Sequence, residues 1–168
     1  MNKPTLLYYE ISGFQKKTLE YVNKFFSLIT LPDPDYDTEE ILKEIKVIFT
    51  PMGFVFDKCK IDKCENLQII GSPTTGTHHI DIEYANKRNI SICSLKNQQG
   101  FLSKITPTAE LAWGLVLAVT RQIPRAHNSA CEGNWNGRVF GEQTPRMLSA
   151  MTLGIIGLGR LGSIVAGY

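Results

Sequence analysis

Short apolar runs alternate with segments of helical periodicity through residues 1–100 of the chain. The runs are rich in Val, Ile, Phe and Tyr and are apolar throughout, which is typical of strands buried on both faces of a parallel sheet. The pattern therefore predicts a doubly wound α/β layer. The predicted strands cover residues 5–9, 26–31, 47–50, 67–71 and 90–94.

Helical segments separate these runs. Thr38 and Asp81 stand at the start of two of them, and their side chains are suited to cap the first free N–H groups of a helix. Asp81 is therefore interpreted as a capping residue rather than a catalytic carboxylate. The predicted helices cover residues 15–25, 38–45, 61–65 (a weak pattern) and 81–88.

The pattern changes after a polar loop at residues 95–104, and we place a domain boundary near Gly100, giving domains 1–100 and 101–168. Thr106 as N-cap and Pro107 at the first helical position begin a helix that extends toward Gln122. This helix is apolar nearly all round, which predicts burial or a subunit interface. Pro124 ends or kinks it. The remaining predicted elements are a helical piece at 125–132, a surface connection at 134–147 and a strand at 153–156.

Composition narrows the class of protein. Hydrophobic residues make up 43% and charged residues 20% of the chain, and the net charge is +2. These values are ordinary for a globular protein, and the charge is too small to indicate nucleic-acid binding. The longest apolar stretch, residues 111–119, is too short to cross a bilayer, and no secretory leader is visible. We expect a cytoplasmic protein without a membrane or nucleic-acid partner.

Four cysteines give no indication of a metal site. Cys59, Cys64, Cys93 and Cys131 show neither C-x-x-C spacing nor a nearby pair of histidines, so zinc binding is not expected. Reduced structural thiols are the simplest interpretation. Cys93 falls on a predicted strand and is expected to be a small buried residue.

An apolar run leads into the motif Gly157-x-Gly159-x-x-Gly162, and a helical pattern follows. Strand, glycine turn and helix in this order are typical of a dinucleotide-binding unit. Gly157 permits the tight turn, Gly159 permits close approach of a pyrophosphate, and Gly162 permits close packing of the helix. The helix N-terminus adds free N–H groups and a partial positive charge. The acid that would hold the ribose, and distinguish NAD from NADP, is expected about 20 residues further on.

Three segments in the same order resemble the D-isomer-specific 2-hydroxyacid dehydrogenases, and particularly their phosphoglycerate dehydrogenase branch. They are residues 66–81 (NLQIIGSPTTGTHHID), residues 109–135 with AEL, RQIP and GNW, and residues 152–162 (TLGIIGLGRLG). The resemblance implies a flavodoxin-like substrate domain followed by the start of a Rossmann domain. It also implies transfer of a hydride between NAD and the α-carbon of a 2-hydroxy or 2-keto acid. We expect a homodimer, with 3-phosphoglycerate as one candidate substrate.

The resemblance also implies site residues. The substrate-binding positions are Thr75, Gly76 and Thr77, in a loop that offers N–H groups to the substrate carboxylate. The cofactor-binding positions are Thr75, Thr108, Gly157, Gly159, Arg160, Leu161 and Gly162. Thr75 and Thr108 match residues near the nicotinamide, whereas the backbone of Arg160 and Leu161 matches the segment that meets the pyrophosphate.

The chain departs from the family pattern at two points. Ser72 stands where phosphoglycerate-specific relatives carry an arginine, and without that charge a phosphate is held less well. The family's catalytic arginine, glutamate and histidine lie beyond the glycine motif, so no catalytic residue is assigned here. We therefore expect the chain to be the N-terminal part of a longer enzyme and to be inactive alone.

Several alternatives remain open from the sequence. An NAD-responsive, non-catalytic binding protein of the corepressor type is one, and a dimerisation piece built on the helix at 106–122 is another. His78 and His79 adjoin the substrate loop, and we interpret them as capping or loop-bonding residues rather than the acid/base. Trp113 and Trp135 are interpreted as core or interface anchors.

Overall fold

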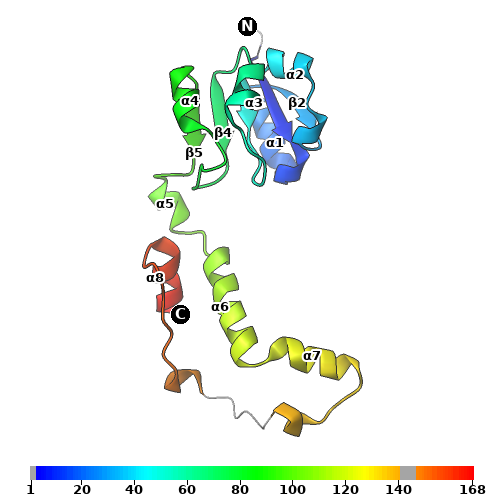
Figure 1. Ribbon diagram of the computed structural model, residues 1–168, viewed down its shortest axis with the longest axis vertical. Helices are drawn as coiled ribbons and strands as arrows, with labels where there is room; N and C mark the ends of the chain where they lie inside the picture. Colours follow the sequence, from blue (N-terminus) through cyan, green and yellow to red (C-terminus); the bar gives the residue numbers. More distant parts are fainter. Residues whose placement is uncertain (1–2, 141–146) are drawn as a thin grey trace. The chain divides into compact units, whose positions relative to one another are not determined.

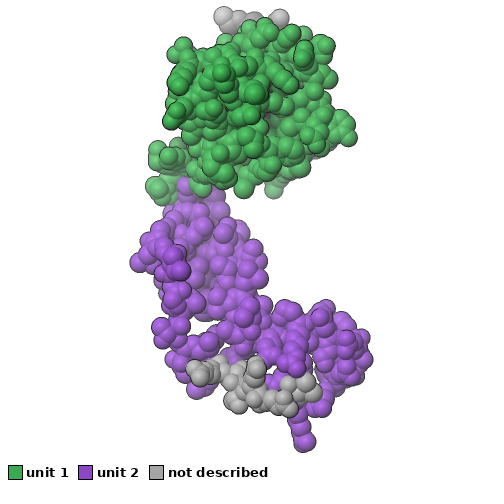
Figure 2. Space-filling model, in the orientation of Figure 1, with its two compact units in different colours: residues 1–99 green, residues 100–168 purple. Residues whose placement is uncertain are grey.

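A computed structural model describes residues 3–140 and 147–168 (Figure 1). The chain divides into two compact units, residues 1–99 and 100–168 (Figure 2). The first unit holds a parallel sheet in the order β2-β1-β3-β4-β5, the flavodoxin-like order. The predicted α/β class is confirmed. The strands are β1 (Thr5–Tyr9), β2 (Ser27–Leu31), β3 (Val47–Phe49), β4 (Ile69–Ser72) and β5 (Ser91–Ser94).

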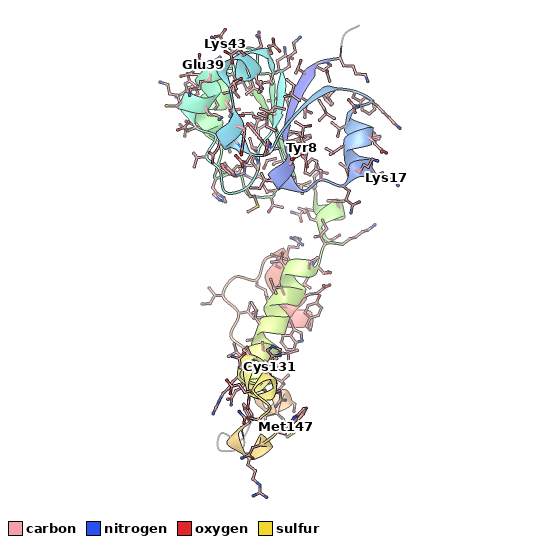
Figure 3. All side chains as sticks on the ribbon, turned by 90° about the vertical axis from the view of Figure 1, so that its right-hand side faces the viewer. Tyr8, Lys17, Glu39, Lys43, Cys131 and Met147 are labelled. Atoms are coloured by element: carbon pink, nitrogen blue, oxygen red, sulfur yellow. The ribbon has the colours of Figure 1, made fainter. Side chains whose placement is uncertain are left out.

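Alternate side chains of the strands enter two apolar clusters, one on each face of the sheet. Leu7 and Tyr9 belong to the larger cluster, whereas Leu6 and Tyr8 (labelled in Figure 3) belong to the smaller one on the other face. Helix α1 (Lys16–Val22) packs on the smaller cluster. The larger cluster is completed by α2 (Glu39–Glu44), α3 (Lys58–Lys63) and α4 (Ile82–Lys87).

Side-chain caps set the start of three helices. Thr38 Oγ1 accepts from Ile41 N–H at 3.3 Å and Asp81 Oδ1 accepts from Tyr84 N–H at 2.9 Å, which confirms both predicted caps. Asp57 caps α3 in the same way. This cap was not predicted, and it explains why α3 begins three residues before the expected 61–65 segment. Helix α1 is shorter than expected and ends at Val22.

A buried polar cluster closes the carboxyl end of β1. Tyr9 Oη donates to both carboxylate oxygens of Asp37, at 2.8 and 2.9 Å. Lys60 forms an ion pair with Asp37, whose side chain is 4% exposed. Burial, followed by the charge of Asp37, raises the pKa of Tyr9 far above its usual range. Tyr9 therefore stays protonated and serves as a donor that fixes the segment before α2.

The second unit is helical in its described part. It contains α5 (Gln99–Leu102), α6 (Pro107–Thr120), α7 (Ile123–Cys131) and α8 (Arg160–Gly167), with 3₁₀ turns at Gly137–Phe140 and Leu148–Ala150. The predicted loop at 95–104 therefore contains a short helix. The strand predicted at 153–156 is wrong: this segment pairs with no strand among the described residues. The predicted connection at 134–147 includes residues 141–146, which lie outside the described residues.

Three side-chain expectations need correction. Thr106 occupies the predicted N-cap position, but its hydroxyl donates to the Glu110 carboxylate and accepts from no backbone N–H of α6. Trp135 is 89% exposed, so it is no core anchor of this chain. Cys93 is exposed on β5, which is one of the two edge strands of the sheet. No helix in the described part of the chain is long and apolar enough to cross a bilayer.

Cysteine labelling checks this packing. Cys64 is buried, and burial raises the pKa of its thiol to about 12, whereas Cys59, Cys93 and Cys131 are exposed. We expect a thiolate-reactive aromatic disulfide at pH 8 to label three thiols in the folded chain and the fourth only after denaturation. Mass spectrometry of the labelled peptides identifies the protected thiol. Labelling of Cys64 at the same rate as Cys59 would contradict the packing of α3.

Candidate functional site

The segment after β4 is a loop whose backbone amides are unpaired. We call residues 74–78 the amide loop. Thr74 O accepts from Leu95 N–H at 3.0 Å, and Gly76 O accepts from Thr74 Oγ1 at 2.6 Å. The N–H groups of the loop have no hydrogen-bond acceptor among the described residues. Consecutive free amides can form a nest that binds an anion. The loop contains the predicted residues Thr75, Gly76 and Thr77.

Hydroxyl groups and a histidine lie buried beneath the amide loop. His79 Nε2 lies 3.3 Å from Thr50 Oγ1 and 3.4 Å from Ser72 Oγ. Ser72 Oγ in turn lies 2.6 Å from Thr74 Oγ1. Thr50, Ser72 and His79 are all buried, at 1%, 4% and 7% exposure. The expected role of His79 in loop hydrogen bonding is confirmed.

The protonation state of His79 follows from its surroundings. Burial lowers the pKa of His79, and the nearby His78 lowers it further. The two rings lie edge to face, with centroids 5.7 Å apart. His79 is therefore neutral at neutral pH. Because Ser72 is buried and bonded to Thr74 and His79, it presents neither a charge nor a free hydroxyl to a ligand.

The glycine motif forms a tight turn into α8. Gly157 has φ +91°, a conformation that favours glycine. A Cβ added at Gly162 would fall on the Gly157 carbonyl oxygen, so Gly162 is required by close packing. A Cβ added at Gly159 meets no atom within 4 Å, so the backbone there is open to a ligand.

The N-terminus of α8 offers free amides beside this open backbone. The first helical hydrogen bond is Ser163 N–H to Gly159 O at 2.8 Å. The N–H groups of Arg160, Leu161 and Gly162 accordingly have no acceptor in the part of the chain that the structure describes. Free amides and the helix dipole together favour an anion such as a pyrophosphate. The turn thus fits the dinucleotide that its sequence predicts.

Arg160 has a second role that the sequence did not reveal. Its Nη1 donates to Leu102 O at 3.0 Å and to Ile105 O at 2.7 Å. The guanidinium thereby binds the turn to the segment between α5 and α6. Thr108, exposed in the first turn of α6, follows Ile105 by three residues. Within the second unit, the structure therefore brings the glycine turn close to the start of α6.

The predicted site residues fall into two groups. Thr75, Gly76 and Thr77 share the amide loop of the first unit. The second unit holds Thr108, Gly157, Gly159, Arg160, Leu161 and Gly162. The hydroxyl network of Thr50 and Ser72 was not predicted from the sequence. The sequence feature that could have indicated this network is the presence of small polar residues at the ends of two buried strands.

Comparison with known families finds matches over nearly the whole chain. Residues 6–122 match the model of the D-isomer specific 2-hydroxyacid dehydrogenase, catalytic domain. Residues 113–168 match the NAD binding domain of the same dehydrogenases. The two matches overlap in α6.

Individual relatives are similar over most of the chain. D-3-phosphoglycerate dehydrogenase of Methanocaldococcus jannaschii is 35% identical over 130 residues, which are 76% of this chain and 23% of the relative. Glyoxylate reductase of Thermococcus litoralis is 32% identical over 157 residues, which are 88% of this chain and 46% of the relative. The chain therefore spans less than half the length of these relatives.

Solved structures share the fold. The D-lactate dehydrogenase from Aquifex aeolicus, solved with NAD and lactic acid, superposes with a TM-score of 0.79 at 23% identity. The alignment covers 98% of this chain and 47% of that chain. The NAD-dependent formate dehydrogenase from Staphylococcus aureus, solved with NAD, gives a TM-score of 0.75 at 24% identity, over 98% of this chain and 52% of that chain.

Two glycine substitutions test the geometry of the turn. Gly162→Ala is expected to loosen α8, because the added Cβ cannot avoid the main chain of Gly157. Overpacking costs about 1–3 kcal/mol, so exchange of the hydrogen-bonded amides of α8, which begin at Ser163, is expected to be at least about fivefold faster. Gly159→Ala is the control, since its φ of −80° and open surroundings accept a methyl group. Equal exchange in the two variants would contradict the close packing of Gly162 on Gly157.

Proposed function

Because the chain belongs to the D-isomer specific 2-hydroxyacid dehydrogenase family, we propose that it carries the substrate loop and the first nucleotide-binding turn of an NAD-dependent oxidoreductase. The enzyme interconverts a 2-hydroxy acid and its 2-keto acid. The observation that carries the proposal is the turn from Gly157 to Gly162, which leaves three amides of α8 free beside the open backbone of Gly159.

In this proposal the chain's own residues bind and orient. The amides of Arg160 and Leu161 would hold the pyrophosphate of NAD, which when bound would accept the hydride that leaves the α-carbon of the hydroxy acid. The amides of Thr75, Gly76 and Thr77 hold the substrate carboxylate, and Thr75 and Thr108 approach the nicotinamide. The groups that activate the carbonyl and move the hydroxyl proton are proposed to lie outside these residues.

A small unphosphorylated acid suits the amide loop better than 3-phosphoglycerate. The position that phosphoglycerate-specific relatives fill with arginine is Ser72, whose hydroxyl is buried and already bonded. A phosphate group would need a positively charged partner for tight binding. A monocarboxylate needs only the amides. We therefore expect glyoxylate or pyruvate to be a better substrate than 3-phosphohydroxypyruvate.

We further propose a homodimer formed through α6. Leu111, Leu115 and Val119 repeat every four residues on one face of this helix and are 63%, 57% and 76% exposed. Ala112 and Val116 adjoin them and line a shallow apolar groove with Leu115 and Val119. An exposed apolar stripe of this kind is typical of an interface. The four free thiols support the expected cytoplasmic location.

NADH oxidation tests the catalytic proposal. The 168-residue chain is expected to show no turnover with glyoxylate, pyruvate or 3-phosphohydroxypyruvate, because no acid/base histidine is assigned in it. The whole protein that contains these residues is expected to oxidise NADH. The reaction is followed by the loss of the near-ultraviolet absorbance of the reduced nicotinamide. Gly159→Asp in that protein is expected to raise the KM for NADH, because a carboxylate would stand where the pyrophosphate is proposed to lie.

A titration of NADH binding, done alongside this assay, separates the alternative functions. Binding of NADH by the whole protein without turnover on any 2-keto acid would support the NAD-responsive binding protein and contradict the dehydrogenase. Failure to bind NADH at all would contradict both. Faster turnover of 3-phosphohydroxypyruvate than of glyoxylate would contradict the inference drawn from Ser72.

The dimer has its own test. Leu115→Lys places a charge in the centre of the apolar stripe and is expected to halve the mass found by light scattering. Asn128→Lys, which adds the same charge to the exposed surface of α7, is the matched control and is expected to leave the mass unchanged. A monomeric wild-type chain, or a dimeric Leu115→Lys variant, would argue against this interface.

A further inference from the structure

His79 is buried beneath the amide loop, and the proposed chemistry leaves it without a role. Its Nε2 faces two hydroxyl oxygens, Thr50 Oγ1 at 3.3 Å and Ser72 Oγ at 3.4 Å. A neutral imidazole has one N–H donor and one acceptor nitrogen, so the direction of these bonds depends on the tautomer. The hydroxyl protons decide which tautomer is present.

One arrangement of the hydroxyl protons satisfies all of these contacts together. Thr74 Oγ1 donates its proton to Gly76 O at 2.6 Å, so it can only accept from Ser72 Oγ at 2.6 Å. Ser72 has then used its proton and must accept from His79. Thr50 Oγ1 lies 3.3 Å from both Gly71 O and His79 Nε2, so it accepts from His79 when its own proton goes to Gly71 O. The Ser72 contact requires the proton on Nε2, and this one N–H is shared with Thr50.

This directed chain fixes the loop peptide that follows Gly76. Because the carbonyl of Gly76 and the N–H of Thr77 belong to one trans peptide, they point in opposite directions. Holding the carbonyl toward Thr74 keeps the Thr77 N–H turned away from the hydroxyl network. The amide is thus left unpaired for an external acceptor, and it has none among the described residues.

We propose that His79 is a positioning residue that, as the Nε2–H tautomer, orders the amide loop through Ser72 and Thr74 so that its amides receive a carboxylate. This inference rests on the proposed function for the identity of the ligand. The order of the hydrogen bonds stands independently of that function. Burial and the neighbouring His78, which both lower the pKa of His79, favour the neutral ring that the chain of bonds requires.

Substitutions at two points of the chain test the inference in the ¹⁵N-labelled 168-residue chain. Thr74→Val removes the hydroxyl that holds Gly76 with little change of shape, and Thr74→Ser retains it. His79→Leu removes the donor, and His79→Gln places an N–H near the position of Nε2. Thr74→Val and His79→Leu are each expected to shift the Thr77 amide and to weaken binding of pyruvate about fivefold, the effect of about one hydrogen bond. Thr74→Ser and His79→Gln are expected to stay within about twofold of wild type.

The readouts distinguish a failure of this inference from a failure of the proposed function. Unchanged amide resonances of β1–β5 establish that a variant is folded. If His79→Leu does not fold, Thr74→Val decides the outcome. Long-range ¹H–¹⁵N spectra of the ring report the tautomer without any ligand. A proton on Nδ1, or a Thr77 amide unaffected by Thr74→Val, would overturn the role of His79 whether or not pyruvate binds. If wild type does not bind pyruvate while the tautomer and the Thr77 shift are as expected, the positioning role holds and the carboxylate assignment fails.

Discussion

The register between β3 and β4 is the constraint on which the candidate site depends. Phe49 pairs with Gly71, and the Thr50 N–H continues the ladder to Gly71 O at 2.9 Å. Thr50 and Ser72 therefore end neighbouring strands at the same height and face the same imidazole. A shift of one residue would turn one of these hydroxyls to the opposite face of the sheet. Glycine at position 71 leaves room for the Phe49 ring on the neighbouring strand, because a Cβ there would strike that ring.

The sheet was predictable because buried parallel strands leave a local trace in the sequence. Apolar runs identified all five strands, and Thr38 and Asp81 identified two helix starts. The errors arose where structure depends on distant partners. Residues 153–156 have a strand-like sequence, but a strand exists only when another strand satisfies its backbone groups. Cys93 lies on an edge strand and belongs to neither apolar cluster. Its exposure depends on which elements pack near that edge, and the local sequence pattern does not show this.

The glycine turn was predictable as local structure, whereas the distant contacts that support it and the amide loop were not. The glycine spacing located the α8 turn, since φ +91° at Gly157 and close packing at Gly162 both require glycine. The role of Arg160 could not be predicted, because its acceptors lie 55 and 58 residues earlier in the chain. The contact between His79 and Thr50 likewise spans 29 residues. Hydrogen bonds of this range depend on the completed fold.

Both parts of the proposed site present backbone amides rather than charged side chains. Such amides are neutral, so they hold an anion only if their directions are fixed before it arrives. Arg160 fixes the glycine turn by binding two carbonyl groups, and the hydroxyl chain beneath Gly76 fixes the amide loop in the same way. In each case the polar side chains bind carbonyl oxygens and leave the N–H groups free. A site of this kind is sensitive to loss of a supporting hydroxyl, even when the residues that would touch the ligand are intact.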